Sequence, residues 1–233
     1  MTFGLTKTAL VAAPLAMTAY GIARILGRID GHYGPGPDWQ IAHLLGLTGM
    51  VLFIPVVLAL RRHATTGQTP ATGHTVTDGR TTGRTVTTGR TDRTDGLAVG
   101  RTLVTTVTVT AAVTLLGLTA TIVQFSADML LAVAATDRDD LRRLQHDFSD
   151  IPGIQPAVYD FGPLLFFVGI VVMAALATRT RSLPRWSPAL MLVAVLLPTA
   201  DLNLMPATGL LMLAALWPLR SRTSSTEPAL TNT

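Results

Sequence analysis

The sequence predicts an all-α polytopic membrane protein, a compact bundle of about six transmembrane helices with an extracytoplasmic amphipathic helix. Two features of its composition indicate this class. Only 14% of the 233 residues are charged, and the mean hydropathy is positive, at +0.44. A soluble domain of this size needs a more charged surface. Long segments without charge also alternate with short charged segments along the chain.

The charged residues are divided unequally between the two sides of such a bundle. An alternating topology places thirteen of the eighteen Lys and Arg residues on one side and ten of the fourteen acidic residues on the other. Because cytoplasmic segments are enriched in Lys and Arg, the basic side is predicted to be cytoplasmic. We therefore expect a multi-pass protein of the plasma membrane with both termini in the cytoplasm.

Residues 1–60 are expected to contain the first two transmembrane helices. The first span covers residues 8–25, and a cleaved signal peptide is the alternative interpretation of this segment. The second covers residues 39–60 and is interrupted only by His43. Small residues lie on one face of this second span, and such faces allow close helix packing in membranes. These residues are Ala42, Gly46 and Gly49.

The segment 61–101 changes abruptly to a composition of Thr, Gly and Arg. Residues 75–81 (TVTDGRT) are echoed ten positions later by residues 85–91 (TVTTGRT). Such a polar, repetitive segment cannot bury a core, so it is predicted to be a disordered cytoplasmic loop. Its arginines either contact anionic lipid head groups or serve only to fix the orientation of the protein.

Residues 102–135 are predicted to form the third transmembrane helix and an outer extension. Eight Thr residues occur in this apolar segment, and their hydroxyls can bond to carbonyls one turn earlier. Asp128 lies near its outer end. Either the helix continues past Asp128, or it breaks near Ser126 and a separate interfacial element follows.

Residues 136–158 are expected to form an extracytoplasmic amphipathic helix and loop. Thr136 is the predicted N-cap, and acidic residues occupy the first turn, where the helix dipole favours negative charge. Leu141, Leu144 and Phe148 share one face of this helix.

Residues 159–219 are predicted to contain the last three transmembrane helices, and residues 220–233 a disordered cytoplasmic tail. The apolar tract 186–219 contains one charged residue, Asp201. A single helix of this length would run about 51 Å, which is much longer than the hydrocarbon core. We therefore expect a helical hairpin that turns near Asp201.

The topology brings four ionisable residues to the outer level of the bundle. His43, Asp128, Asp160 and Asp201 are the primary candidates for a polar pocket that faces outward. Ionisable groups inside a membrane domain usually face a polar interior or a water-filled cavity, because burial in lipid is costly. Further polar residues of the outer side are secondary candidates: Asp30, His32, Asp38, Asp139 and His146.

The sequence predicts neither a metal site nor a cofactor. Cysteine is absent, and no motif of metal ligands or phosphate-binding glycines occurs. Nucleic acid is not an expected partner, since no aromatic residue lies among the basic residues of the long loop. The expected partners are the lipid bilayer and a small cation or an amphiphilic ligand. No oligomeric state is predicted.

Three functions are compatible with the sequence. The leading hypothesis is a pocket that binds or moves a proton, a cation or a small amphiphilic solute, with His43 titrating near neutral pH. The first alternative is a membrane-embedded acid–base enzyme acting on a lipid or isoprenoid, for example a cyclase, with Asp128 and Asp201 as its acids. The second is a non-catalytic accessory or immunity membrane protein.

Overall fold

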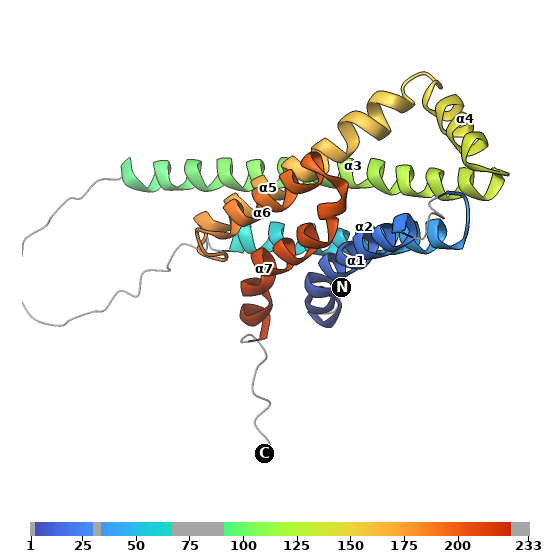
Figure 1. Cartoon of the computed structure of the whole chain (residues 1–233). Helices are drawn as coiled ribbons and strands as arrows, with labels where there is room; N and C mark the ends of the chain where they lie inside the picture. The colour runs from blue at the N-terminus through green and yellow to red at the C-terminus, as the bar shows by residue number, and fades with distance from the viewer. Residues whose placement is uncertain (1–2, 30–33, 67–90, 225–233) are drawn as a thin grey trace, which may run out of the picture.

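The computed structural model describes residues 3–29, 34–66 and 91–224, and it confirms the predicted all-α bundle (Figure 1). No β-strand occurs within these ranges. The elements, in chain order, are α1 (Phe3–Ile29), α2 (Pro37–Thr66), α3 (Thr91–Ala134), α4 (Arg138–Ser149), the π-helix η1 (Gln155–Asp160), α5 (Phe161–Arg179), α6 (Ser187–Ala200), the 3-10 helix η2 (Leu202–Leu204) and α7 (Met205–Ser224).

Five helical segments are long and apolar enough to cross a membrane. They are Gly4–Ile29, Pro37–Thr65, Gly100–Ala134, Gln155–Arg179 and Leu202–Arg220. The sixth expected span, α6, has 14 residues and is about 21 Å long, which is shorter than the hydrocarbon core. The bundle therefore consists of five full-length apolar helices and one short one.

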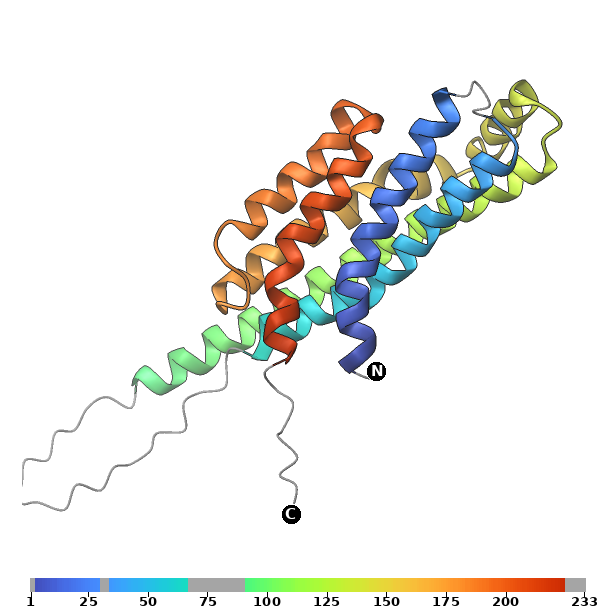
Figure 2. The same ribbon diagram turned by 60° about the horizontal axis from the view of Figure 1, so that its bottom comes forward.

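The expected hairpin within residues 186–219 is confirmed. Helix α6 ends at Ala200, and Asp201 adopts an extended conformation with φ −154° and ψ 125°. The Asp201 carboxylate accepts a 2.8 Å hydrogen bond from the amide of Asn203, which closes the turn. The chain then continues into α7, which runs antiparallel beside α6 (Figure 2).

Helix α3 runs without a break to Ala134, so the chain continues as one helix past Asp128. Its hydroxyl groups are bonded within the helix, as in the 2.9 Å hydrogen bond from Thr121 to the Gly117 carbonyl.

Helices α2 and α3 also extend into both ends of the loop that was expected at 61–101. The remainder of that loop, residues 67–90, lies outside the described residues. Helix α7 likewise continues to Ser224, four residues beyond the start of the expected tail.

Helix α4 confirms the predicted amphipathic helix but begins one residue later than expected. Asp137, rather than Thr136, is the N-cap, and its carboxylate accepts a 2.8 Å hydrogen bond from the amide of Asp140. The amide of Thr136 in turn donates to the Asp140 carboxylate. Leu141 is buried, while the polar face of the helix is exposed.

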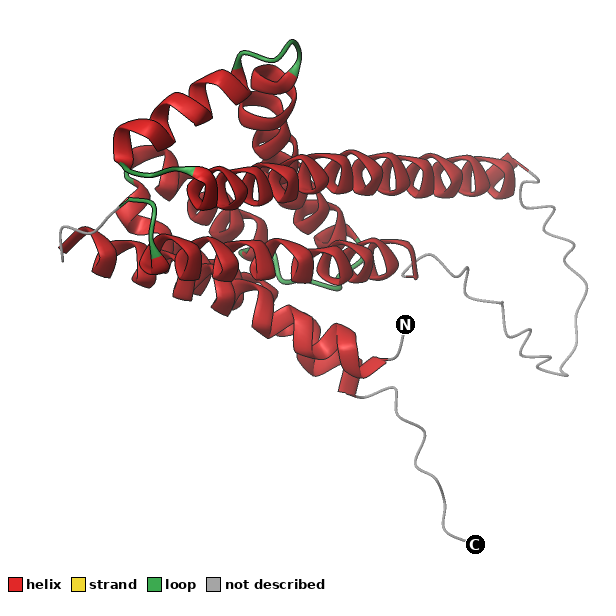
Figure 3. Ribbon diagram, turned by 90° about the vertical axis from the view of Figure 1, so that its right-hand side faces the viewer, coloured by secondary structure: helices red, strands yellow, loops and turns green. Residues whose placement is uncertain are grey.

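Glycines allow the helices to approach one another closely, as expected for helices that pack in lipid. A Cβ atom at Gly49 of α2 would lie 3.3 Å from the Ala13 carbonyl oxygen of α1. A Cβ atom at Gly117 of α3 would lie 2.6 Å from the Gly162 carbonyl oxygen of α5. The small-residue face predicted on α2 is therefore a packing face. Figure 3 shows the long helices lying alongside one another.

The long helices run in alternating directions along the chain, so that successive helices end at opposite ends of the bundle (Figure 2). At one end, Arg28 of α1 donates a 3.1 Å hydrogen bond to the Asn203 side chain in the α6–α7 turn. At the opposite end, the hydroxyls of Thr180 and Ser182 donate to the His63 carbonyl. We call the first the acidic end, because Asp38, Asp128, Asp160 and Asp201 lie there, and the second the basic end. Which end faces the cytoplasm stays a prediction.

Candidate functional site

His43 lies in an aromatic environment in the interior of the bundle. Its side chain is buried, with the residue only 6% exposed. Its Nδ1 atom is 2.9 Å from the Trp39 carbonyl oxygen, and since a carbonyl can only accept, Nδ1 is the donor. The imidazole stacks on the Trp39 ring, meets the Tyr20 ring at an angle of 75° and lies tilted against the Phe125 ring. Its closest contacts are thus aromatic rings and a backbone carbonyl, and the guanidinium of Arg24 is near enough to act on it electrostatically.

Asp128 connects three elements at the acidic end. Its Oδ1 atom accepts a 3.1 Å hydrogen bond from Gln145 of α4 and a 3.2 Å hydrogen bond from the Tyr159 hydroxyl of η1. Sequence reasoning did not select Gln145 as a site residue. A signal was present, because Gln145 follows Leu141 by four positions and is therefore a polar residue on the apolar face of α4.

Asp160 and Asp201 are both exposed. Asp160 accepts a 3.0 Å hydrogen bond from the Gln155 side chain, and it does not cap α5. Asp201 bonds to Asn203 in the α6–α7 turn. Within the described ranges, no hydrogen bond, ion pair or ring contact joins any two of His43, Asp128, Asp160 and Asp201. The structure therefore distributes the four primary candidates over separate environments.

The secondary candidates lie on the surface or outside the described residues. Asp38 is exposed. Asp139 pairs with Arg142 at 3.2 Å on the exposed face of α4. His146 lies 3.5 Å from Asp150 on the same helix. Asp30 and His32 fall outside the residues that the structure describes.

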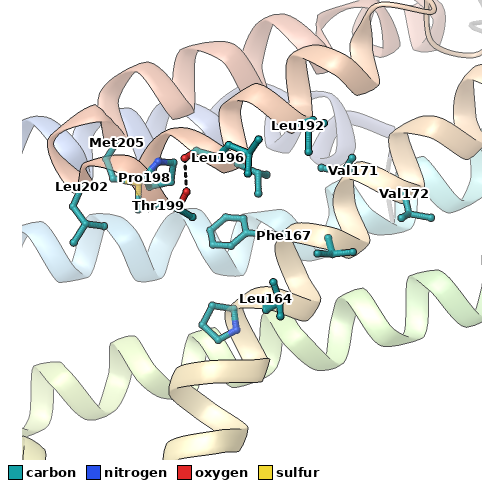
Figure 4. A pocket seen from close by; sticks show the side chains of 13 residues that line it. Leu164, Phe167, Val171, Val172, Leu192, Leu196, Pro198, Thr199, Leu202 and Met205 are labelled. Carbon is teal, nitrogen blue, oxygen red and sulfur yellow. Dashed lines mark hydrogen bonds between the residues drawn. The ribbon is translucent and has the colours of Figure 1, made fainter.

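An apolar groove of about 470 Å³ lies between α5 and α6 (Figure 4). Helix α5 contributes Leu164, Phe167 and Val171, and α6 contributes Leu192 and Leu196. Two further lining residues, Val195 and Met205, are almost completely buried and form its floor. Leu164, Leu192 and Leu196 are about half exposed, so the groove opens on the outside of the bundle.

The lining of the groove offers almost no hydrogen-bonding group. Thr199 supplies a side-chain hydroxyl, but this hydroxyl donates a 2.6 Å hydrogen bond to the Leu196 carbonyl of its own helix (Figure 4). The other lining side chains are aliphatic, aromatic or Pro, apart from the thioether of Met205. Such a surface complements a hydrocarbon chain rather than an ion or a sugar.

Two of the predicted site residues are close in the chain to residues that line one end of this groove. Asp160 precedes the lining residue Leu164 by four positions, so that it continues the same face of the helical chain by one turn. Asp201 lies between the lining residues Thr199 and Leu202. The groove thus has an apolar lining, and Asp160 and Asp201 lie close to that lining in the chain without being part of it.

Within the described part of the chain, no group of three or more His, Asp or Glu side chains is placed to hold a metal ion.

No protein-family model, curated protein or solved structure matches the chain. The fold and its apolar helices therefore define the class, which is a multi-pass α-helical membrane protein.

Proposed function

We propose that the protein binds a membrane-resident amphiphile whose hydrocarbon chain lies in the groove between α5 and α6. The observation that carries this proposal is the groove itself, with about 470 Å³ of space and an apolar lining. Ligand sites typically enclose roughly 300–1,000 Å³ and are mostly apolar. The groove opens on the outer surface of the bundle, where lipid chains would surround a membrane-spanning protein, so an amphiphile can reach it from within the bilayer.

The placement of the ionisable residues favours binding over acid–base catalysis. A catalytic acid and base must lie within hydrogen-bonding reach of one reacting centre. Asp128 is bonded to Gln145 and Tyr159, whereas Asp201 is bonded to Asn203 in a different turn. His43 is enclosed by aromatic rings. We therefore assign the ligand to the groove and not to a common His/Asp pocket.

Photo-crosslinking of the full chain in lipid nanodiscs tests this proposal. The probe is a single-chain amphiphile that carries a diazirine in its alkyl chain, and the modified residues are mapped by mass spectrometry. We expect adducts to concentrate on α5 and α6 side chains that line the groove. Adducts spread evenly over exposed apolar residues, such as Leu116 of α3, would contradict the proposal.

A matched pair of substitutions on α6 separates the groove from the general lipid-facing surface. Leu192 lines the groove and is 47% exposed, whereas its neighbour Val193 does not line it and is 48% exposed. Leu192→Trp should lower groove labelling several-fold, because the indole occupies space that the alkyl chain needs. Val193→Trp introduces the same indole outside the groove and should leave labelling unchanged. Equal effects of the two variants would argue against occupancy of the groove.

A further inference from the structure

We infer that the groove between α5 and α6 selects single-chain amphiphiles with a cationic ammonium head group, and that Asp160 and Asp201 recognise this head group. This inference rests on the proposed function, because it assigns the polar end of the ligand whose apolar end lies in the groove. It adds the chemical class of the ligand, which the apolar lining alone does not define.

Selection by this groove has to depend on the head group. A hydrocarbon chain that moves from the bilayer into an apolar groove leaves one apolar environment for another, so it gains little hydrophobic free energy. The Thr199 hydroxyl is already bonded to the Leu196 carbonyl and offers no further donor to the ligand. Polar groups beside the end of the groove are therefore the ones that can distinguish one amphiphile from another.

Asp160 is the better placed of the two carboxylates. It lies one helical turn before Leu164 and about two turns before Phe167, which both line the groove. An aspartate at the start of a helix often bonds to amides of the first turn, but Asp160 makes no such bond. It is exposed, and its partner is the neutral amide of Gln155, which bonds to Oδ1. The Oδ2 atom of Asp160 is therefore available to a ligand.

Asp201 reinforces the negative charge at the same end. It is exposed and bonded to the neutral side chain and amide of Asn203. A guanidinium also lies close to this turn, because Arg28 donates to the Asn203 side-chain oxygen. Within the described residues neither Asp160 nor Asp201 forms an ion pair, so no directly bonded cation offsets the negative charge of either carboxylate. Arg142 and Arg143 are paired with Asp139 and Asp140 on α4.

This charge balance determines which head group fits. A net negative charge attracts an ammonium group and repels a phosphate, sulfate or carboxylate. A primary ammonium has three donors, which match the carboxylate oxygens that Asp160 and Asp201 present. The occupant with the complementary chemistry is therefore an alkylammonium amphiphile, with its chain along α5 and α6 and its nitrogen beside the two carboxylates.

The test compares two photoreactive probes with the same diazirine-bearing chain, one ending in a primary ammonium and the other in a sulfate. Wild-type protein in nanodiscs of a zwitterionic phospholipid should be labelled in the groove more strongly by the ammonium probe. Asp160→Asn should lower groove labelling by the ammonium probe about fivefold, which corresponds to the loss of roughly 1 kcal/mol of attraction between unit charges at contact in water, and it should thereby weaken the preference. Asp160→Asn combined with Asp201→Asn should abolish it.

Two controls keep the result specific to these positions. Asp139→Asn removes an exposed acidic charge from α4 and should leave the preference unchanged. Asp160→Glu retains the charge and should retain the preference. A measurement without any substitution is also available, since raising the salt concentration should weaken the preference of the wild type for the ammonium probe.

The outcomes distinguish the claim that the groove binds an amphiphile from the claim that the two carboxylates select its head group. Equal groove labelling by the ammonium and sulfate probes, or a preference that survives the double substitution, would overturn the head-group inference and leave the groove as a binding site. If neither probe labels the groove above the surrounding surface, the proposed function itself fails, and the head-group inference fails with it.

Discussion

The hydroxyl of Tyr159 donates a 3.2 Å hydrogen bond to the carboxylate of Asp128, which ties the segment just before α5 to the C-terminal half of α3. Gln145 of α4 donates to the same carboxylate oxygen. Because the three residues come from α3, α4 and η1, this small network fixes how the chain returns from α3 to α5. It also sets the position of Asp160, the residue that follows Tyr159.

Tyr159→Phe removes one of the two hydrogen-bond donors to Asp128 and should destabilise the protein by about 1 kcal/mol, since the carboxylate is half-buried. The ring contact between Tyr159 and Phe148 can persist in this variant. Thermal unfolding in detergent would measure the change. In an Asp128→Asn background the same substitution should have a smaller effect, and equal effects in both backgrounds would show that the bond contributes nothing.

The contact between α3 and α5 at Gly117 should not tolerate a larger side chain. A Cβ atom there would lie 2.6 Å from the Gly162 carbonyl oxygen, and still closer to the Phe166 amide nitrogen. Both are backbone atoms, which cannot move aside as a flexible side chain would. Gly117→Ala should therefore destabilise the protein by roughly 1–3 kcal/mol. Gly4→Ala, where nothing lies within 4 Å, is the control and should have little effect in the same unfolding measurement.

The fold class and the hairpin at Asp201 could be predicted because the cost of placing charge in lipid constrains where helices begin and end. The same reasoning predicts one depth for the four ionisable residues, and that depth stays a prediction. It could not give the direction in which each residue points around its helix. Asp128 faces α4 and η1, whereas His43 faces Tyr20 and Phe125. A shared predicted depth along the bundle therefore does not imply that the side chains of these residues contact one another.

The groove could not be predicted from the sequence. Its lining residues Phe167 and Leu196 are apolar, like the residues that face lipid elsewhere on the bundle. Whether two such faces pack together or leave a space depends on the distance and angle between α5 and α6, which tertiary contacts determine. Asp160 was predicted as a site residue for its depth, and it precedes the lining residue Leu164 by about one helical turn.

Acidification should loosen α4. The hydrogen bond from Arg143, followed by that from the Thr136 amide, lowers the pKa of Asp140 below its ordinary value of about 4. Because the folded-state pKa is depressed, the stability contributed by Asp140 is present above pH about 4 and is lost as the pH falls through the folded-state value. Hydrogen exchange of the α4 amides, corrected for intrinsic rates, should therefore show decreasing protection below pH about 4.

Two substitutions in the first turn of α4 test whether Asp140 is responsible. Asp140→Asn removes the acceptor that bonds Arg143 and Thr136, so its α4 protection should already be lower at neutral pH and should change less on acidification. Asp139→Asn removes a charge one position away without removing these bonds, and it should retain the response of the wild type. A wild-type protection that is unchanged between pH about 5 and pH about 3 would contradict the assignment.

The absence of cysteine makes the predicted orientation directly measurable. Ile151→Cys places a thiol in the exposed link between α4 and η1, at the acidic end, and Thr82→Cys places one in the Arg-rich segment between α2 and α3. Since basic segments are retained in the cytoplasm, a membrane-impermeant maleimide should label position 151 in intact cells and position 82 only after permeabilisation. Val57→Cys, at a fully buried position of α2, should stay unlabelled in both conditions. Labelling of position 82 in intact cells would reverse the orientation and place Asp160 and Asp201 on the cytoplasmic side, where the groove would meet the inner leaflet.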